Sequence, residues 1–165
     1  MKPVRFWFNG GYADLGVPEG SDDGFQGSAI RIGSGPAAPV LRISVLRTRP
    51  HRKGGPASAE EALRLTRFAE AGTLETLDRN RAVLAVVVPA ADGDENVVAH
   101  VWHLGIPGPD ASIVIAIFSL ATEAARADQP ETRASVEAIS SAVRGAQFVF
   151  FDEDKATWKT DFEDA

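Results

Sequence analysis

The fold is decided by Ser112-Ile113-Val114-Ile115-Ala116-Ile117-Phe118-Ser119-Leu120, a nearly unbroken apolar run, together with the segment that follows it. An apolar run of this length between turn residues is typical of a strand that is buried on both faces. After a polar bend, residues 128–146 repeat apolar side chains at helical spacing. The sequence therefore predicts a central β-strand followed by a closing helix.

Other short apolar or alternating segments predict further strands around this pair. Residues 4–8 and 12–17 are joined by Asn9-Gly10-Gly11, which supplies the positive φ angles that a tight hairpin needs. Three segments separated by turn residues predict an antiparallel meander: 82–88, 97–104 and 112–121. The remaining strands are expected at residues 29–32, 40–48 and 74–77.

Two helices are predicted from residues that are typical of helix ends. Ser58 and Glu61 have the spacing of a capping box, and this central helix is expected to stop at Gly72. Asp128 is the expected N-cap of the closing helix, with Pro130 in its first turn. We therefore predict an α+β fold with a single antiparallel sheet of about six or seven strands and one central and one C-terminal helix packed on it. Because the central strand is apolar on both sides, the helices need not share a face.

The domain organisation follows from the charge of the C-terminal end. Residues 1–151 are expected to form a single α+β domain, and residues 152–165 an acidic tail with six acids and two lysines. Trp158 and Phe162 lie four positions apart, so this tail could form one amphipathic helical turn, or it could be disordered.

Composition argues against several classes of protein. The 165 residues include no cysteine, which excludes disulfides, thiol nucleophiles and Cys-ligated metals. The net charge of −6 disfavours nucleic-acid binding, since phosphate neutralisation needs clustered Lys and Arg. No apolar run approaches the roughly 18 residues of a membrane span, and the first residues do not have the pattern of a secretory signal. We expect a cytoplasmic protein without membrane insertion.

The sequence contains no complete catalytic or metal-binding motif. His100 and His103 are an odd number of positions apart on a predicted strand, so they should point to opposite faces and cannot readily share a metal. Residues 92–96 begin like a calcium loop, but Val97 and His103 replace the Gly and Glu that it needs. The acids that could form a catalytic pair stand at strand ends or turns, where acids are ordinary: Asp14, Glu19, Glu75 and Asp78. We expect no cofactor and no enzymatic activity.

Partner binding is the remaining interpretation of the charged and aromatic residues. Residues 40–59 hold five basic residues and no acid, which indicates either a solvated loop or a site that steers an oppositely charged partner. Trp102 shares a predicted strand face with His100; Trp is enriched at interface anchors, and a buried core Trp is the alternative. The predicted partner-binding residues are Arg42, Arg47, Arg49, Arg52, His100 and Trp102.

Three segments and their order carry a resemblance to a known family. They are Val17-Pro18-Glu19-Gly20, the step from Val40-Leu41-Arg42-Ile43-Ser44-Val45 to Ser58-Ala59-Glu60-Glu61-Ala62-Leu63, and Ser141-Ala142-Val143-Arg144-Gly145-Ala146-Gln147-Phe148. Across residues 4–148 the chain resembles the fold shared by the photosystem subunit PsbP, the Ran-binding Mog protein and bacterial DcrB-like proteins. Related sequences often have Trp after Pro-Glu-Gly, where this chain has Ser21.

The resemblance implies a non-catalytic role. Members of this fold include the Eag chaperones, which look after hydrophobic segments of type VI secretion effectors, and others occur beside bacterial toxin genes. We therefore expect a non-catalytic protein-binding domain: a secretion chaperone, adaptor or immunity-type partner of a secreted effector or toxin. The alternative is a small-molecule-binding or enzymatic domain with a pocket between sheet and helix. A purely structural domain stays open, as does a homodimer through exposed edge strands.

Overall fold

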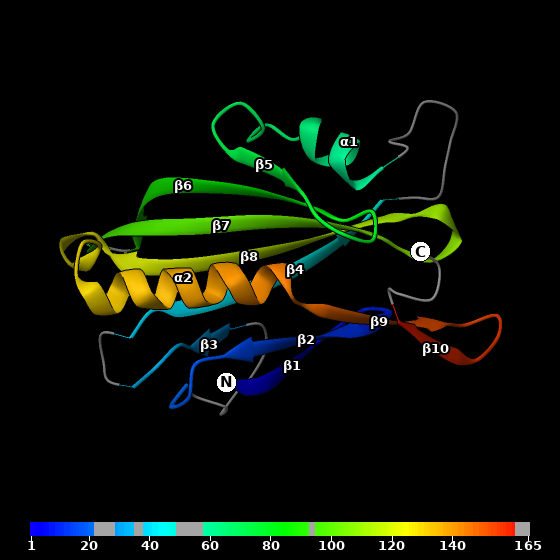
Figure 1. The fold of residues 1–165 in the computed structure, drawn as a ribbon, viewed down its shortest axis with the longest axis horizontal. Coiled ribbons are helices and arrows are strands. Elements are labelled where there is room, and N and C mark those ends of the chain that lie inside the picture. The colour runs from blue at the N-terminus through cyan, green and yellow to red at the C-terminus, as the bar shows by residue number, and fades with distance from the viewer. Residues whose placement is uncertain (22–28, 35–37, 49–57, 93–94, 161–165) are drawn as a thin grey trace.

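The strands of the protein form two antiparallel sheets (Figure 1). The computed structural model describes residues 1–21, 29–34, 38–48, 58–92 and 95–160. The four-stranded sheet has the order β1-β2-β9-β10, and the six-stranded sheet has the order β3-β4-β8-β7-β6-β5. An α+β fold of antiparallel strands is therefore confirmed, but the prediction of a single sheet is wrong.

The elements have the following bounds. The four-stranded sheet contains β1 (Lys2–Phe8), β2 (Gly11–Val17), β9 (Gln147–Asp152) and β10 (Thr157–Thr160). The six-stranded sheet contains β3 (Ala29–Arg31), β4 (Val40–Arg47), β5 (Thr73–Thr76), β6 (Ala82–Asp92), β7 (Glu95–Pro107) and β8 (Ile113–Glu123). The helices are α1 (Ala59–Arg64) and α2 (Pro130–Arg144), and two 3₁₀ turns are η1 (Pro109–Ala111) and η2 (Ala124–Arg126).

A second sheet exists because the chain after α2 pairs with the N-terminal hairpin. Phe148 and Phe150 alternate with half-exposed residues along β9, which is the pattern of a strand with one buried face. β9 pairs with β2, and among the described residues no strand pairing joins this hairpin to the meander. β10 then pairs with β9. Part of the segment that the sequence predicts as an acidic tail or a helical turn is therefore an edge strand of this sheet.

The predicted meander is confirmed by β6, β7 and β8, which pair in sequence order. β8 lies between β4 and β7, so its apolar run is central in the six-stranded sheet, as predicted. One face of β8 is buried in the core through Val114, Ala116, Phe118 and Leu120. Its other face is only partly buried beyond Ile113, so two-sided burial holds at one end of the strand alone.

Both helices form where they are predicted, with different ends. The capping box is confirmed at α1, where Ser58 Oγ accepts a hydrogen bond from the backbone N–H of Glu61 at 3.1 Å. α1 ends at Arg64, because residues 65–72 fold into successive hydrogen-bonded turns. α2 begins at Pro130 with Gln129 in the capping position, one residue after the predicted cap.

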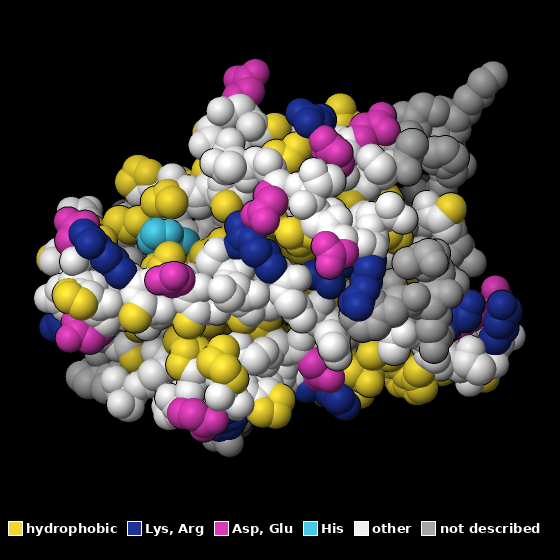
Figure 2. All heavy atoms as spheres, viewed as in Figure 1, with side chains coloured by type: hydrophobic (Ala, Val, Ile, Leu, Met, Phe, Trp, Pro, Cys, Tyr) yellow, Lys and Arg dark blue, Asp and Glu magenta, His cyan; other side chains and the backbone are white. Residues whose placement is uncertain are grey.

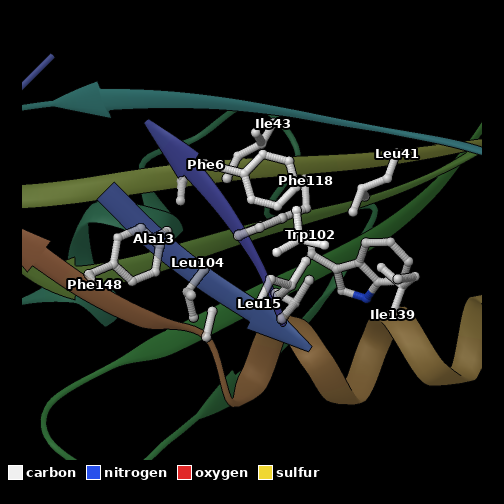
Figure 3. Close-up of a cluster of buried hydrophobic side chains, with 14 of the residues drawn as sticks. Phe6, Ala13, Leu15, Leu41, Ile43, Trp102, Leu104, Phe118, Ile139 and Phe148 are labelled. Atoms are coloured by element: carbon white, nitrogen blue, oxygen red, sulfur yellow. The ribbon is translucent and has the colours of Figure 1, made fainter. Parts of the chain in front are cut away.

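The main core lies between the two sheets and α2 (Figure 3). Phe6 comes from β1, Trp102 from β7, Phe118 from β8 and Ile139 from α2. A smaller cluster on the other face of the six-stranded sheet joins α1 to Leu84, Ile113 and their neighbours. The two helices therefore pack on opposite faces of this sheet. Within the described residues, neither helix has the length and hydropathy to cross a membrane.

Candidate functional site

The predicted partner-binding residues do not form one surface. Trp102 is 3% exposed and packs in the main core, so its ring is closed to a partner. Arg42 is exposed, but it lies on the opposite face of the six-stranded sheet: Trp102 pairs with Phe118, whereas Arg42 pairs with the next residue, Ser119. The expected face containing Arg42, His100 and Trp102 is therefore absent, because alternation along β8 separates its members.

The other predicted residues are scattered. The ring of His100 is half-buried and stacks on Trp102 with centroids 6.2 Å apart. Arg47 is exposed at the end of β4, and its Nε donates to Ser112 Oγ at 3.3 Å. Arg49 and Arg52 lie outside the described residues.

A different surface is formed by the outer face of the four-stranded sheet. Along β1, Phe6 points into the core, so the next residue, Trp7, points to the outer face. The register places Tyr12 opposite Trp7, and Trp158 opposite Phe151. We call Trp7, Tyr12, Phe151 and Trp158 the aromatic surface. In Figure 2, hydrophobic side chains gather beneath the β9–β10 hairpin, at the lower right of the molecule.

The rings of the aromatic surface contact one another. Ring centroids are 5.0 Å apart for Trp7 and Tyr12, 5.7 Å for Tyr12 and Trp158, and 6.2 Å for Trp7 and Trp158. Phe151 extends the cluster with its centroid 5.1 Å from that of Trp158. Trp7 remains 64% exposed and Trp158 51% exposed. Because tryptophan is usually well buried, two such side chains on one face make this surface a candidate for interaction.

A shallow pocket of about 240 Å³ opens beside these rings. It is lined by Trp7, Phe8, Gly10, Gly11, Phe151, Glu153 and Trp158. Gly11 is needed here: a Cβ atom at this position would lie 2.2 Å from the carbonyl oxygen of Val149. The backbone N–H of Phe151 also donates to the carbonyl of Gly10 at 2.8 Å. The tight turn between β1 and β2 thus brings β9 against the pocket floor.

Arg5 forms one rim of the aromatic surface. Its Nε and one terminal nitrogen donate to the two carboxylate oxygens of Asp14 at 2.8 and 3.0 Å. This hydrogen bonding raises the pKa of Arg5, so the guanidinium stays charged. Its central carbon lies 3.9 Å from the centroid of the Tyr12 ring. A cation held between a carboxylate and an aromatic face is therefore already part of this surface.

A groove of about 340 Å³ lies against α2, next to His100. Its lining residues are His100, Ala127, Arg133, Val136, Glu137, Ser140, Ser141 and Arg144. Burial lowers the pKa of His100, which favours its neutral imidazole at pH 7. Arg144 is held by Glu75, with nitrogen and oxygen 2.8 Å apart, and it also donates to Ser140. The groove therefore offers hydroxyls and a neutral imidazole beside apolar side chains.

Metal-ligand side chains are not clustered in the described part of the chain. No group of three or more His, Asp or Glu residues there is placed to hold a metal ion. Among the described residues, the aromatic surface and the groove combine apolar side chains with polar groups, and both are candidate binding sites.

Comparison with known proteins gives a likeness in fold alone. A protein from Bacteroides thetaiotaomicron VPI-5482, with a crystal structure at 1.50 Å resolution, matches with a TM-score of 0.52 and 10% sequence identity. The match covers 86% of this chain and 46% of the other, so this chain spans about half the length of that protein. No protein-family model matches the sequence, and no curated protein matches it.

Proposed function

We propose that this chain is a non-catalytic protein-binding domain that docks its partner on the aromatic surface. The observation that carries the proposal is the exposure of Trp7 and Trp158, at 64% and 51%, within a cluster of touching rings. Tryptophan and tyrosine dominate the binding energy of many interfaces, because they bury a large area with few rotatable bonds. A partner that covers this cluster would remove a large apolar area from water.

The arrangement of the cluster supports the same proposal. Its rings come from all four strands of one hydrogen-bonded sheet, and each ring is restrained by a neighbouring ring. Side chains that are already ordered lose little conformational entropy when a partner binds. The surface therefore suits a partner that is recognised by shape and stacking.

The family resemblance suggests which kind of protein the partner is. The segments at residues 17–20, 40–45, 58–63 and 141–148 resemble the PsbP, Mog and DcrB-like family, whose members include secretion chaperones. We infer a cytoplasmic role as a secretion chaperone, adaptor or immunity-type partner of a bacterial effector or toxin. On this proposal, the apolar part of the effector or toxin lies over Trp7 and Trp158.

A pull-down from the native host tests the proposal. The parent chain and the Leu65→Ala variant should retain the same partner, since Leu65 is an exposed apolar residue outside the aromatic surface, at 72% exposure. The double variant Trp7→Ala, Trp158→Ala should lose it. Retention of the partner by the double variant would sink the proposal. Light scattering on the purified chain then shows whether a second copy is itself the occupant.

A second candidate is small-molecule binding in the groove beside His100. The observation that favours it is the convergence of His100, Ser140 and the paired Arg144 on one cavity between helix and sheet. A fragment screen that follows the imidazole signals of His100 by NMR tests it. Saturable shifts that disappear in a Ser140→Val variant would support this function, whereas no saturable shift would remove it.

A further inference from the structure

The pocket beside Trp158 has the chemistry of a site for one basic side chain. Its lining residues include Trp7, Phe151 and Trp158 together with the acid Glu153. The faces of aromatic rings carry partial negative charge, so they attract ammonium and guanidinium groups. We propose, building on the proposed function, that this pocket receives a lysine or arginine side chain of the docked partner.

The size of the pocket fits a single side chain. Its volume of about 240 Å³ lies below the roughly 300–1,000 Å³ of pockets that take drug-sized molecules. An extended Lys or Arg stem can lie along the rings and place its charged end at the rim, as long basic side chains commonly do. A partner residue is therefore a better occupant than a free metabolite.

Charges around the pocket favour a cation. Asp152, Glu153 and Asp154 stand together at the turn between β9 and β10. Within the described part of the chain, Glu153 has no ion-pair partner. Lys159 neighbours Trp158 in β10, but alternation directs it to the other face of the sheet. Lys155 in the same turn and Arg47, whose Nη1 would lie 4.0 Å from a Cβ atom placed on Gly10, offset two of the three charges of Asp152, Glu153 and Asp154, so a net negative charge remains around the pocket.

The same surface already holds a cation in this way. Arg5 lies 3.9 Å from the Tyr12 centroid and is hydrogen-bonded to Asp14. The lining of the pocket offers the same two residue types, an aromatic residue (Trp158) and an acid (Glu153). Arg5 is thus an intramolecular model for the bound partner side chain.

Matched peptides test the inference on the full chain. The probes are acetyl-Gly-Lys-Gly-amide, acetyl-Gly-Arg-Gly-amide and the uncharged acetyl-Gly-norleucine-Gly-amide, followed through the indole N–H signals of the three tryptophans by NMR. The two cationic peptides should shift Trp7 and Trp158 and leave buried Trp102 unchanged. They should bind at least about twofold more tightly than the norleucine peptide, which corresponds to the lower limit for an exposed cation–π contact.

A charge variant separates this inference from the proposed function. Glu153→Gln keeps the shape of the side chain and should weaken the cationic peptides by about two- to fivefold, the effect of losing an exposed ion pair. Glu70→Gln, which removes an exposed acid elsewhere, should leave their affinity unchanged. Equal binding of the norleucine peptide, no response at Trp7 and Trp158, or unchanged affinity in Glu153→Gln would each overturn the inference. The proposed function is judged separately, by loss of the partner in the tryptophan double variant.

Discussion

Trp7, on the first strand, and Trp158, on the last, lie edge to face with their ring centroids 6.2 Å apart and their planes at 76°. Their strands do not pair with each other, because β2 and β9 stand between β1 and β10. The contact therefore forms only after the N-terminal hairpin has paired with the chain that follows α2. The aromatic surface is a property of the whole four-stranded sheet.

Removing the two exposed tryptophans should leave the fold intact. The double variant Trp7→Ala, Trp158→Ala loses contacts among exposed rings but no buried side chain. We expect its free energy of unfolding to fall by about 2 kcal/mol, since four exposed ring contacts are lost at about 0.5 kcal/mol each. Trp102→Ala should cost about 3–5 kcal/mol, since that ring fills the core. Urea unfolding measures the stability of both variants. Equal losses in the double variant and in Trp102→Ala would contradict the exposed position of Trp7 and Trp158 and the buried position of Trp102.

Gly11 should be far less tolerant of a methyl group than Gly16, although both lie on β2. A Cβ at Gly11 would meet the Val149 carbonyl oxygen at 2.2 Å, whereas one at Gly16 would find its nearest neighbour, the Met1 side chain, at 3.8 Å. Gly11→Ala should therefore push β9 away and cost about 1–3 kcal/mol or more. Gly16→Ala should stay within about 1 kcal/mol of the parent. Thermal melting compares them, and similar stabilities would refute the close approach of β2 and β9.

Arg81 should stabilise the end of α2. Its guanidinium donates to the carbonyl oxygens of Ala146 at 3.0 Å and Arg144 at 2.8 Å, which ties the helix end to the turn before β6. Arg81→Met keeps the aliphatic stem but removes both donors, so we expect a loss of about 1–3 kcal/mol. As a control, Arg133→Met removes an exposed ion pair and should change stability by less than about 1 kcal/mol. Chemical unfolding measures the free energy of both variants. Equal losses in Arg81→Met and Arg133→Met would disprove that Arg81 stabilises the end of α2.

Stability should fall as the pH drops below about 6.5, partly through His103. The side chain is 5% exposed, and its ring lies tilted against that of Phe68 with centroids 5.3 Å apart. Its Nδ1 has no hydrogen-bond partner among the described residues. Burial lowers the pKa of His103, and a contact with the backbone of Leu84 opposes this in part.

The lowered pKa of His103 determines the direction in which stability changes with pH. The unfolded chain binds a proton at His103 near pH 6.5, while the folded chain resists it until a lower pH, so the stabilisation is complete above pH 6.5 and is lost below it. His103→Phe should flatten the dependence of the urea midpoint on pH between 7.5 and 5, and His100→Gln should also flatten it, since burial lowers the pKa of His100 as well. An unchanged slope in His103→Phe would exclude His103 as a contributor.

Much of the six-stranded sheet could be predicted from local patterns. The meander and the central place of β8 follow from short apolar runs separated by turn residues, and the start of α1 follows from Ser58 and Glu61. The second sheet could not be predicted in the same way, because it depends on the long-range pairing of β2 with β9. Local periodicity identifies a strand, but it does not identify the strand's partner.

The candidate site was missed for a related reason. Alternation along residues 4–8 already indicates that Trp7 faces away from Val4 and Phe6, so its exposure was open to prediction. Trp158 lies in a segment whose acidic composition is typical of a tail, and only the pairing of β10 with β9 brings it beside Trp7. Conversely, Trp102 satisfies the composition of an interface anchor, but the four-stranded sheet and α2 cover it.

The central claim is that the aromatic surface binds a protein partner. Isothermal titration of the recovered partner against the parent chain and against the Trp7→Ala, Trp158→Ala variant tests it most directly. Two anchors that each contribute at least about 1.4 kcal/mol predict that the double variant binds about a hundredfold more weakly, while the Leu65→Ala control binds as the parent does. Equal affinity of the parent and the folded double variant would contradict the claim.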